Sequence, residues 1–470
     1  MTAERGKFVC HSFQMKYITV VLIYMIVIVK GIVLLCISTS MIVSSDTSTD
    51  HANRTTTSGI ITFDGIPLKN MELYYFKIIL SSFGIGYSIA ACIGGIIADL
   101  YGGRYCILFG MTSLSTAGLV FPFIIVHMPW YIIIVIFFLQ GLCEGVMIPG
   151  QYSLYARWIP TNEITLIVGC LHPCRVLSQI TVKYMMYYLQ HRIANFWTWM
   201  LFFWGGVGLT VAFFAFIFVF SNPFQCKMSS EKEKKDMEIV GGKNPKRINW
   251  KMIFEDEAAW AAMIEHIAHL WQNRLLQVEL SKILKSSHEN VGPFPVQASV
   301  TLWCVVLAAV GSSVVVNRLV KKQRIPVIYM RTVANALSTL VPGVLLELTY
   351  NTNYGKNLSV ILCPLALSFK SIHAPSGQTN VLDLTRYYAG TIIGIQIGVG
   401  TALSFVIPII RQGVLESPDI TDWGQMYDLS FSSCLIAMLL YMIWARAERA
   451  AWDVVIEDDD DDEFIEEVTE

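Results

Sequence analysis

Long apolar blocks separated by short polar stretches run along most of the chain. A transmembrane helix needs roughly 20 predominantly apolar residues, and in hydrocarbon it satisfies its own backbone groups. Eight blocks are clear candidates: residues 17–44, 76–98, 105–126, 130–152, 196–221, 297–317, 388–410 and 427–446. Four more have helical length but carry charges, Pro or Gly: residues 163–189, 257–281, 327–349 and 357–375. The pattern predicts an all-α membrane protein with twelve transmembrane helices.

The composition fits a protein that is dissolved in the lipid bilayer. Of the 470 residues, 54% are hydrophobic and 15% are charged. The formal net charge is −2 and the basic residues lie between apolar blocks, so no continuous cationic face for nucleic acid is expected. Most of the eleven cysteines fall inside apolar blocks, which argues against a disulfide scaffold. Because no nucleophile with a base, phosphate loop or closed metal-ligand set is recognisable, we expect neither an enzyme nor a metal or other cofactor.

The charges between the blocks predict the topology. Residues 223–256 hold the richest cluster of Lys and Arg, and loops of this kind remain in the cytoplasm. Both termini are then cytoplasmic as well. Two N-x-[ST] sequons, at Asn53 and Asn357, fall in loops that this topology places outside, where glycosylation occurs. The alternative is that both sequons are unoccupied.

The polar loop in the middle of twelve helices indicates two six-helix halves. This is the plan of many secondary transporters, which bind their substrate at the midplane between the halves. We expect the halves at residues 1–222 and 257–447 and the cytoplasmic loop at residues 223–256. The acidic tail, residues 448–470, is expected to be disordered because a run of like charges cannot bury surface.

Two loop segments support an internal repeat. Residues 94–104 read GGIIADLYGGR, in which small residues permit close helix approach and Asp99 can pair with Arg104 at the cytoplasmic surface. Residues 311–318, GSSVVVNR, look like a decayed counterpart. The first copy resembles the loop signature of the major facilitator superfamily, except that Leu100 stands where that pattern usually has a base.

Three further segments narrow the resemblance. They are residues 81–87 (SSFGIGY), residues 139–163 (LQGLCEGVMIP, then ARWIP and a glutamate) and residues 376–395 (SGQTNVLDL, then YAG and GI). In this order they resemble the anion:cation symporter family, which includes sialin, the vesicular glutamate transporters and sodium/phosphate cotransporter-like proteins. The resemblance implies a major facilitator fold, alternating access, and symport of an organic or inorganic anion with protons or sodium.

The chain departs from this family at several positions. No arginine lies near the external end of the first helix, and Phe137 replaces an arginine seven residues before Glu144. His269 stands where some members have Arg or Asn, and Val381 and Thr385 replace a His and a Pro of the second-half signature. The anion-binding cations of the family are therefore partly absent, which leaves the substrate open.

Ionisable residues also fall inside the predicted helices, where each costs about 2.5–3.5 kcal/mol on insertion scales and needs a partner, a wet cavity or a change of protonation. Glu144 lies near Gly141 and Gly145, which leave room for another helix or a substrate. The resemblance implies that Glu144 couples transport to protons, and a structural hydrogen bond is the alternative. Lys30 lies about 21 Å along a helix from Lys16. We expect it to take over charge balance or anion attraction from the missing first-helix arginine, with Glu144 as its partner; the alternative is that the helix is displaced and Lys30 snorkels.

The predicted fifth helix carries Pro173 near mid-membrane, between His172 and Arg175. Proline removes a backbone hydrogen bond and frees carbonyls that line cavities in transporters. Arg175 is the best-placed candidate to bind a substrate anion, because guanidinium forms bidentate bonds with carboxylate or phosphate. His172 is a candidate beside it. An ion pair between Arg175 and either Glu144 or Glu265 is the alternative.

The predicted seventh helix is too polar to face lipid. Glu265 and His269 are four residues apart and share one face. We expect this face to line the central cavity, with His269 titrating near neutral pH or contacting the substrate. A Glu–His hydrogen bond between packed helices is the alternative, and no third metal ligand lies at a suitable spacing. Tyr87 is expected to help shape the cavity.

Gating residues are expected at the cytoplasmic ends of the helices. Asp99 and Arg104 form one candidate pair. Asp383 and Arg386 form another, with Asn380 beside them near the tenth helix. A surface ion pair without a gating role is the alternative for this second pair.

Together these features predict a monomeric carrier in the plasma membrane or in an endolysosomal or vesicular membrane. It would move a small anionic solute by alternating access, together with a proton or a sodium ion. The rival hypothesis is a transport-inactive relative that acts as a ligand sensor or membrane interaction protein. Phe137, Leu100 and the missing first-helix arginine motivate this rival.

Overall fold

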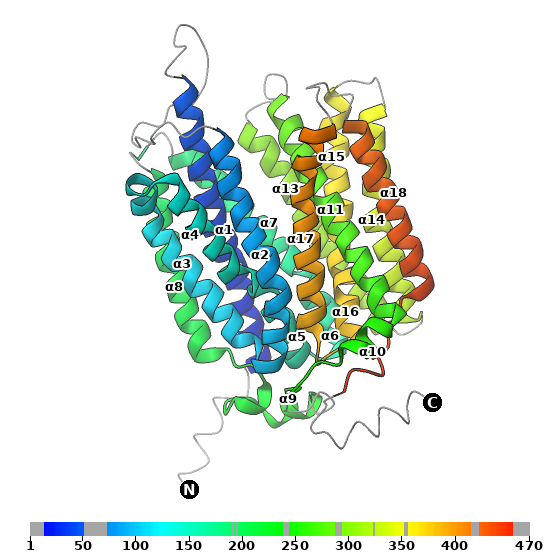
Figure 1. Ribbon diagram of the computed structural model, residues 1–470. Coiled ribbons are helices and arrows are strands. Elements are labelled where there is room, and N and C mark those ends of the chain that lie inside the picture. The colour runs from blue at the N-terminus through cyan, green and yellow to red at the C-terminus, as the bar shows by residue number, and fades with distance from the viewer. Residues whose placement is uncertain are drawn as a thin grey trace.

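The computed structural model describes residues 14–50, 73–189, 192–193, 196–237, 244–286, 294–322, 325–351, 356–414 and 423–454. Within these ranges the chain is helical and contains no strand, as predicted. The helices form twelve passes that stand side by side (Figure 1), so the predicted all-α fold is confirmed.

Six passes form the N-terminal half. They are α1 (Met15–Asp50), α2 (Leu73–Tyr101), α3 (Gly103–His127), α4 (Trp130–Gly145) with α5 (Met147–Trp158), α6 (Thr161–Gly169) with α7 (Leu171–Leu189), and α8 (Phe196–Phe218). The fourth and fifth passes are each broken four residues before a proline. Pro149 and Pro173 cannot donate the backbone hydrogen bond to the carbonyls of Gly145 and Gly169, where α4 and α6 end.

Six more passes form the C-terminal half. They are α11 (Glu257–Ser286), α13 (Phe294–Lys321), α14 (Val327–Asn351), α15 (Lys356–Lys370) with η3 (Ser371–His373), η4 (Ala374–Gln378) and α16 (Thr379–Leu384), then α17 (Ala389–Val414) and α18 (Trp423–Trp444). The tenth pass changes from α-helix to a tight turn at η3 and a wide π-turn at η4. Both turns are buried, and such irregular backbone in a membrane protein occurs where it packs inside the protein or lines a cavity.

Eight described helices are long and apolar enough to cross a membrane. They include Thr161–Leu189, which the sequence pattern placed among the weaker candidates. Within the described side chains α17 counts only as a shorter apolar helix, Ala389–Ser404, although its block was a clear candidate. Large apolar side chains such as Phe213 and Ile443 are well exposed on the outer surface, as expected for helices that face lipid.

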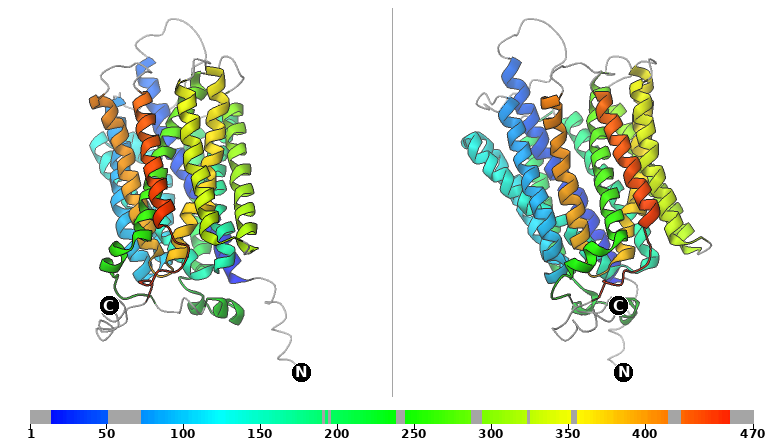
Figure 2. Two further views of the ribbon diagram at one scale, coloured as in Figure 1. Left: turned by 90° about the vertical axis from the view of Figure 1, so that its right-hand side faces the viewer. Right: turned by 45° about the vertical axis from the view of Figure 1, so that its right-hand side comes forward.

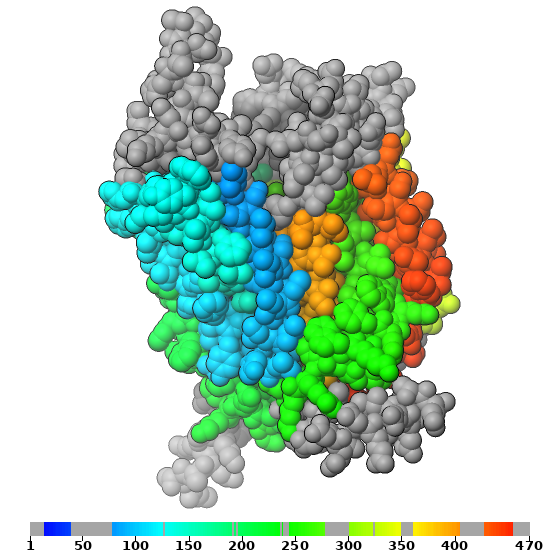
Figure 3. Space-filling model, in the orientation of Figure 1, coloured from blue at the N-terminus to red at the C-terminus, as the bar shows by residue number. Residues whose placement is uncertain are grey.

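The two halves stand beside one another, with α1–α8 on one side and α11–α18 on the other (Figures 1 and 2). Between them in sequence lie three short helices, η1 (Pro223–Gln225), α9 (Glu231–Asp236) and α10 (Trp250–Glu255). The last two lie at one end of the bundle, which we call the loop end; α1 begins and α18 ends there as well. In the space-filling view α2 and α17 lie against each other across the boundary between the halves (Figure 3).

The halves are sealed together at the loop end. Gly95 of α2 approaches the start of α17 so closely that an added Cβ would lie 2.2 Å from the carbonyl oxygen of Gly390. The fully buried Asp99 accepts hydrogen bonds from Gly390 N at 3.2 Å, from Thr391 N at 2.6 Å and from Thr391 Oγ1 at 2.8 Å. A carboxylate at a helix N-terminus satisfies free N–H groups and is favoured by the helix dipole.

The predicted pair between Asp99 and Arg104 is wrong. Arg104 donates instead to the carbonyl oxygen of Phe216, and its guanidinium lies over the rings of Phe216 and Phe220. The two side chains point in different directions: Asp99 reaches across the boundary to α17, whereas Arg104, the second residue of α3, faces α8.

The predicted latch between Asp383 and Arg386 is also wrong. Asp383 pairs with Arg331 of α14, with Nε and Oδ2 2.9 Å apart. Arg386 reaches across the boundary, where it donates to the carbonyl oxygens of Ala156 at 3.4 Å and Ile159 at 3.0 Å. Arg331 also bridges the halves, because its Nη2 donates to Thr165 Oγ1 at 2.9 Å.

A strap of chain after α18, residues 445–454, folds back under this seal. Asp453 is buried and accepts from Thr385 Oγ1 at 2.6 Å and from Arg386 N and Tyr387 N at 2.9 Å each. Trp452 Nε1 donates to Asp256 Oδ2 at 2.7 Å. Residues 448–454 are therefore packed, although the sequence assigned them to a disordered tail; residues 455–470 lie outside the described part of the chain.

Candidate functional site

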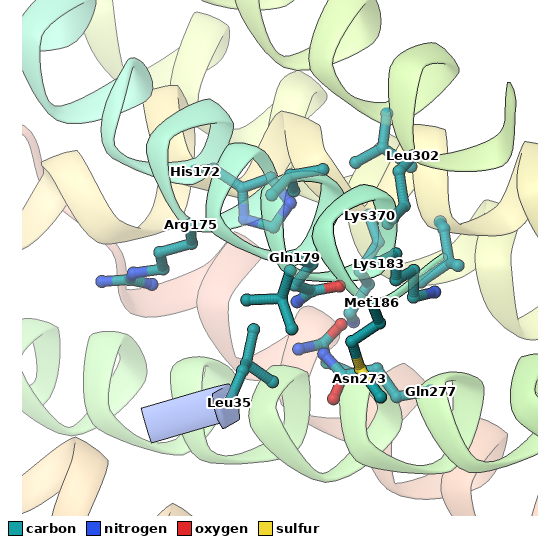
Figure 4. A pocket seen from close by; sticks show the side chains of 14 residues that line it. Leu35, His172, Arg175, Gln179, Lys183, Met186, Asn273, Gln277, Leu302 and Lys370 are labelled. Carbon is teal, nitrogen blue, oxygen red and sulfur yellow. The ribbon is translucent and has the colours of Figure 1, made fainter. Parts of the chain in front are cut away.

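A cavity of about 390 Å³ lies between the two halves (Figure 4). Its walls come from α1 and α7 of the first half and from α11, α13 and α15 of the second. The lining residues are Leu35, His172, Arg175, Val176, Gln179, Val182, Lys183, Met186, Asn273, Gln277, Leu302, Val305, Leu367 and Lys370. This is the midplane position at which two-half carriers bind their substrates.

The lining is basic. Arg175 and Lys183 come from α7 and Lys370 from α15, and none of the described lining residues is an Asp or a Glu. The side chains of Lys183, Gln179 and Asn273 gather around the hollow in Figure 4, with Arg175 to one side. Cations in a cleft with low-dielectric walls raise the local concentration of anions. The remaining walls are mostly aliphatic, so the cavity suits a small anion that also carries apolar surface.

Lys370 is the least expected member of this lining. Its side chain is 1% exposed and donates to Gln272 Oε1. Gln272 Nε2 in turn donates to the carbonyl oxygen of Thr339 at 3.1 Å. Within the described residues Lys370 has no carboxylate partner within 4 Å. Sequence reasoning missed Lys370 and Lys183, although the rule that intramembrane cations are functional candidates would have found both.

Lys30 and Glu144 form the contact that the sequence predicted. Lys30 Nζ lies 3.7 Å from Glu144 Oε2, and Glu144 is fully buried. Gln140 Nε2 donates to the other carboxylate oxygen at 3.2 Å. Lys30 Nζ also lies 5.6 Å from the centre of the Tyr87 ring. Lys30 therefore does not snorkel, and Tyr87 packs on this pair rather than lining the cavity.

The two glycines around Glu144 serve close helix packing. A Cβ added at Gly141 would lie 2.1 Å from the carbonyl oxygen of Phe83, and one at Gly145 2.4 Å from that of Tyr87. Helix α2 thus fills the room that the sequence left open to either a helix or a substrate.

Glu265 and His269 do not line the cavity, contrary to expectation. Glu265 is 1% exposed, and its Oε1 accepts from Thr339 Oγ1 at 3.3 Å and lies 3.6 Å from His373 Nδ1. The ring of His269 stacks on that of His373, with centroids 3.5 Å apart. Glu265 and His269 do share one face of α11, but this face packs against η3 and α14 and does not line the cavity. His373 was missed because nothing in the linear spacing links it to the seventh pass.

The other predicted residues are placed as follows. His172 and Arg175 line the cavity, and the described residues show no ion pair between Arg175 and Glu144 or Glu265. Asn380 is fully buried, and its side-chain N and O atoms lack hydrogen-bond partners in the described part of the chain. Asn53 lies outside the described residues. Asn357 lies in the first turn of α15 with its side chain outside them, so glycosylation stays a prediction.

The profile of the Major Facilitator Superfamily matches residues 66–408 of the chain. The chain belongs to this superfamily. Among curated proteins it is 24% identical over 394 residues to the putative inorganic phosphate cotransporter of Drosophila ananassae, covering 81% of each chain. It is 22% identical to human sialin, covering 80% of this chain and 76% of sialin. It is also 22% identical to bovine vesicular glutamate transporter 1, covering 80% and 68%.

Solved structures share the superfamily fold. The proton:xylose symporter XylE matches with a TM-score of 0.68 at 12% identity, over 93% of this chain and 98% of that one. The fucose:proton symporter FucP of E. coli matches with a TM-score of 0.60 at 11% identity, over 92% and 100%. The predicted fold and the predicted resemblance to a divergent anion carrier are thereby confirmed.

Proposed function

We propose that this superfamily member is a secondary active transporter that moves a small organic anion or inorganic phosphate by alternating access. The observation that carries the proposal is the cavity between the halves, whose described lining residues include three cations and no acid. The names of relatives in several organisms, which include phosphate, glutamate and ascorbate transporters, support an anionic substrate. We also place the loop end in the cytoplasm, because the basic stretch of residues 223–256 begins and ends there.

The cations suit alternating access because they come from both halves. Arg175 and Lys183 belong to the first half and Lys370 to the second. An anion that contacts both sets screens their mutual repulsion and draws the halves together around it. Ligand binding then favours the state in which the cavity is closed, as differential affinity for two states requires.

The coupling ion is a proton rather than sodium. Sodium needs several oxygen ligands, whereas Lys30 already places a cation 3.7 Å from Glu144. Protonation of Glu144 would remove the negative charge that holds Lys30 and free this cation to attract the substrate anion. Release of the proton on the other side would restore the pair and favour release of the anion.

Uptake into liposomes tests the proposal. Purified protein should accumulate a radiolabelled organic anion or phosphate under an inward proton gradient, and Lys370→Met should weaken this uptake. Lys322→Met removes an exposed lysine at the end of α13, away from the cavity, and serves as the matched control. No flux for a broad anion panel, with anion binding retained, would favour the ligand sensor instead.

A further inference from the structure

The core of the C-terminal half holds an ionisable cluster that the cavity does not include. Glu265, His266 and His269 come from α11, and His373 comes from η3. All four side chains are more than nine-tenths buried. Burying so many ionisable groups is expensive unless each finds a partner, so the arrangement of their hydrogen bonds decides what the cluster can do.

The cluster has more polar atoms than partners. His373 Nδ1 lies 2.9 Å from Asn335 Oδ1 and 3.6 Å from Glu265 Oε1. In contrast, His373 Nε2, His269 Nδ1 and His266 Nδ1 have no hydrogen-bond partner among the described residues. A neutral imidazole has one nitrogen with a lone pair, and such a nitrogen can take up a small cation, either a proton or a metal ion.

A metal ion fits these residues poorly. Ligand atoms of Glu265, His269 and His373 do lie within 4.8 Å of one another. However, the rings of His269 and His373 stack 3.5 Å apart at only 18° between their planes. An imidazole binds a metal with a lone pair in its ring plane, and nearly parallel planes at this separation do not meet at one ion. The buried ammonium of Lys370 also acts on both histidines and repels a dication.

A proton fits the same residues well. The charged and titratable groups that act on the cluster from neighbouring elements are Lys370 of α15, His172 and Arg175 of α7, and Cys434 and Tyr441 of α18. Among the described groups in and around the cluster, Glu265 is the carboxylate without an arginine partner, because Asp383 forms an ion pair with Arg331. One proton can therefore move between Glu265 and His373, and the stacked His269 limits the pair of rings to a single positive charge.

Lys370 links this cluster to the cavity because it belongs to both. It lines the cavity, and its ammonium donates to Gln272, whose amide donates to the carbonyl oxygen of Thr339; the hydroxyl of Thr339 donates to Glu265 in the core. When an anion in the cavity neutralises Lys370, Glu265 loses its compensating charge and gains a proton more readily. We infer that Glu265 and His373 form a second proton site, in the C-terminal half, whose occupancy is linked through Lys370 to the anion in the cavity. This inference rests on the proposed function only for the identity of that anion.

Infrared difference spectroscopy tests the proton site without requiring transport. A protonated carboxyl group gives a C=O band that disappears as the group ionises, so a pH titration of the purified full-length protein reports each buried acid. We expect Glu265→Gln to remove one titrating band and Glu144→Gln to remove a different one. Glu255→Gln, at an exposed acid of α10, should remove neither. An unchanged spectrum for Glu265→Gln overturns the inference.

Further variants keep the test decisive. Glu265→Asp should move the band without removing it, which separates a proton site from a folding defect. His373→Gln should shift the titration midpoint of the Glu265 band, and a midpoint within error of the unmodified protein contradicts the pairing. Zinc binding is the contrary result. If the unmodified protein keeps one zinc ion per chain after dialysis and His373→Gln does not, the cluster is a metal site and the inference is overturned.

The linkage to the anion is measured in the same spectra. Phosphate and benzoate serve as probes, each added at a fixed pH. Either probe that binds should increase the Glu265 band, and Lys370→Met should abolish the increase; an increase that survives Lys370→Met contradicts the linkage.

If the Glu265 band titrates but no anion is transported, the proposed function fails and the proton site stands. If transport occurs without the band, the inference alone fails.

Discussion

Each half buries an acid within 4 Å of a basic side chain, but the two basic partners differ. Glu144 of the first half faces the ammonium of Lys30 at 3.7 Å. Glu265 of the second half faces His373, a partner that can itself gain or lose a proton, at 3.6 Å. On the proposals above, the first arrangement would switch between an ion pair and a neutral acid with a freed lysine. The second would share one proton between two groups, so the carrier would hold two chemically distinct proton sites.

The largest expected effect breaks the first site. Glu144→Gln leaves Lys30 buried without its counter-charge, and removal of one partner of a buried ion pair costs about 3–5 kcal/mol. Because an amide can neither take up nor release the coupled proton, we expect Glu144→Gln to abolish concentrative uptake in liposomes. Uptake that remains within a factor of two would show that the pair has no part in coupling.

A double variant separates coupling from simple instability. Lys30→Met together with Glu144→Gln removes both charges, so it should be more stable to heat than Glu144→Gln alone while remaining uncoupled. Thermal unfolding of the four proteins in the cycle gives the interaction energy. Equal melting temperatures for the single and double variants would contradict a direct interaction.

The next effect concerns the cavity. Arg175→Met and Lys370→Met each remove a cation from the lining, and a hydrogen bond to a charged group is worth about 1.5–3 kcal/mol. We expect KM for the transported anion to rise by about 10- to 100-fold in each variant. Uptake kinetics measure this, with Lys322→Met as the control. Unchanged KM in both variants would move the binding site elsewhere.

A subtler effect distinguishes the second proton site from the first. Glu265→Gln keeps the Lys30–Glu144 pair, so transport should continue but with one proton fewer per anion. The reversal potential of uptake at defined pH and anion gradients gives this ratio. A ratio equal to that of the unmodified protein would assign Glu265 a structural role.

The smallest effect concerns the seal. Asp453→Asn weakens the hydrogen bonds that hold residues 385–387 under the boundary, which should cost about 1–3 kcal/mol of stability. We expect a lower melting temperature and a modest loss of uptake. Glu448→Gln changes an exposed acid in the same strap and should leave both unchanged. Matching values for the two variants would show that the strap does not support the seal.

The fold could be predicted from the sequence because apolar length and loop charge are local signals. The contact between Lys30 and Glu144 could also be predicted, since two buried charges of opposite sign in one half require partners. The partners of Asp99, Asp383 and Arg386 could not. Asp99 and Arg386 reach across the boundary between the halves, and Asp383 reaches α14 within its own half, so none of these partners is encoded in local spacing.

The C-terminal cluster shows the same limit. Residues 265 and 269 share a helix face, as their spacing predicts, but that face packs on η3, where the chain leaves regular helix. The position of His373 depends on the turns at η3 and η4, and no periodic pattern encodes these turns. Lys370, one turn earlier, joins the cavity for the same reason.

Accumulation of a labelled anion in liposomes tests the central claim most directly, that a basic cavity between the halves carries an anion together with a proton. With an inward proton gradient, internal anion should rise above the external concentration. A protonophore should abolish this rise, as should Glu144→Gln, while Glu255→Gln should leave it intact. Accumulation that is indifferent to the proton gradient, or transport of cations in preference to anions, would contradict the account.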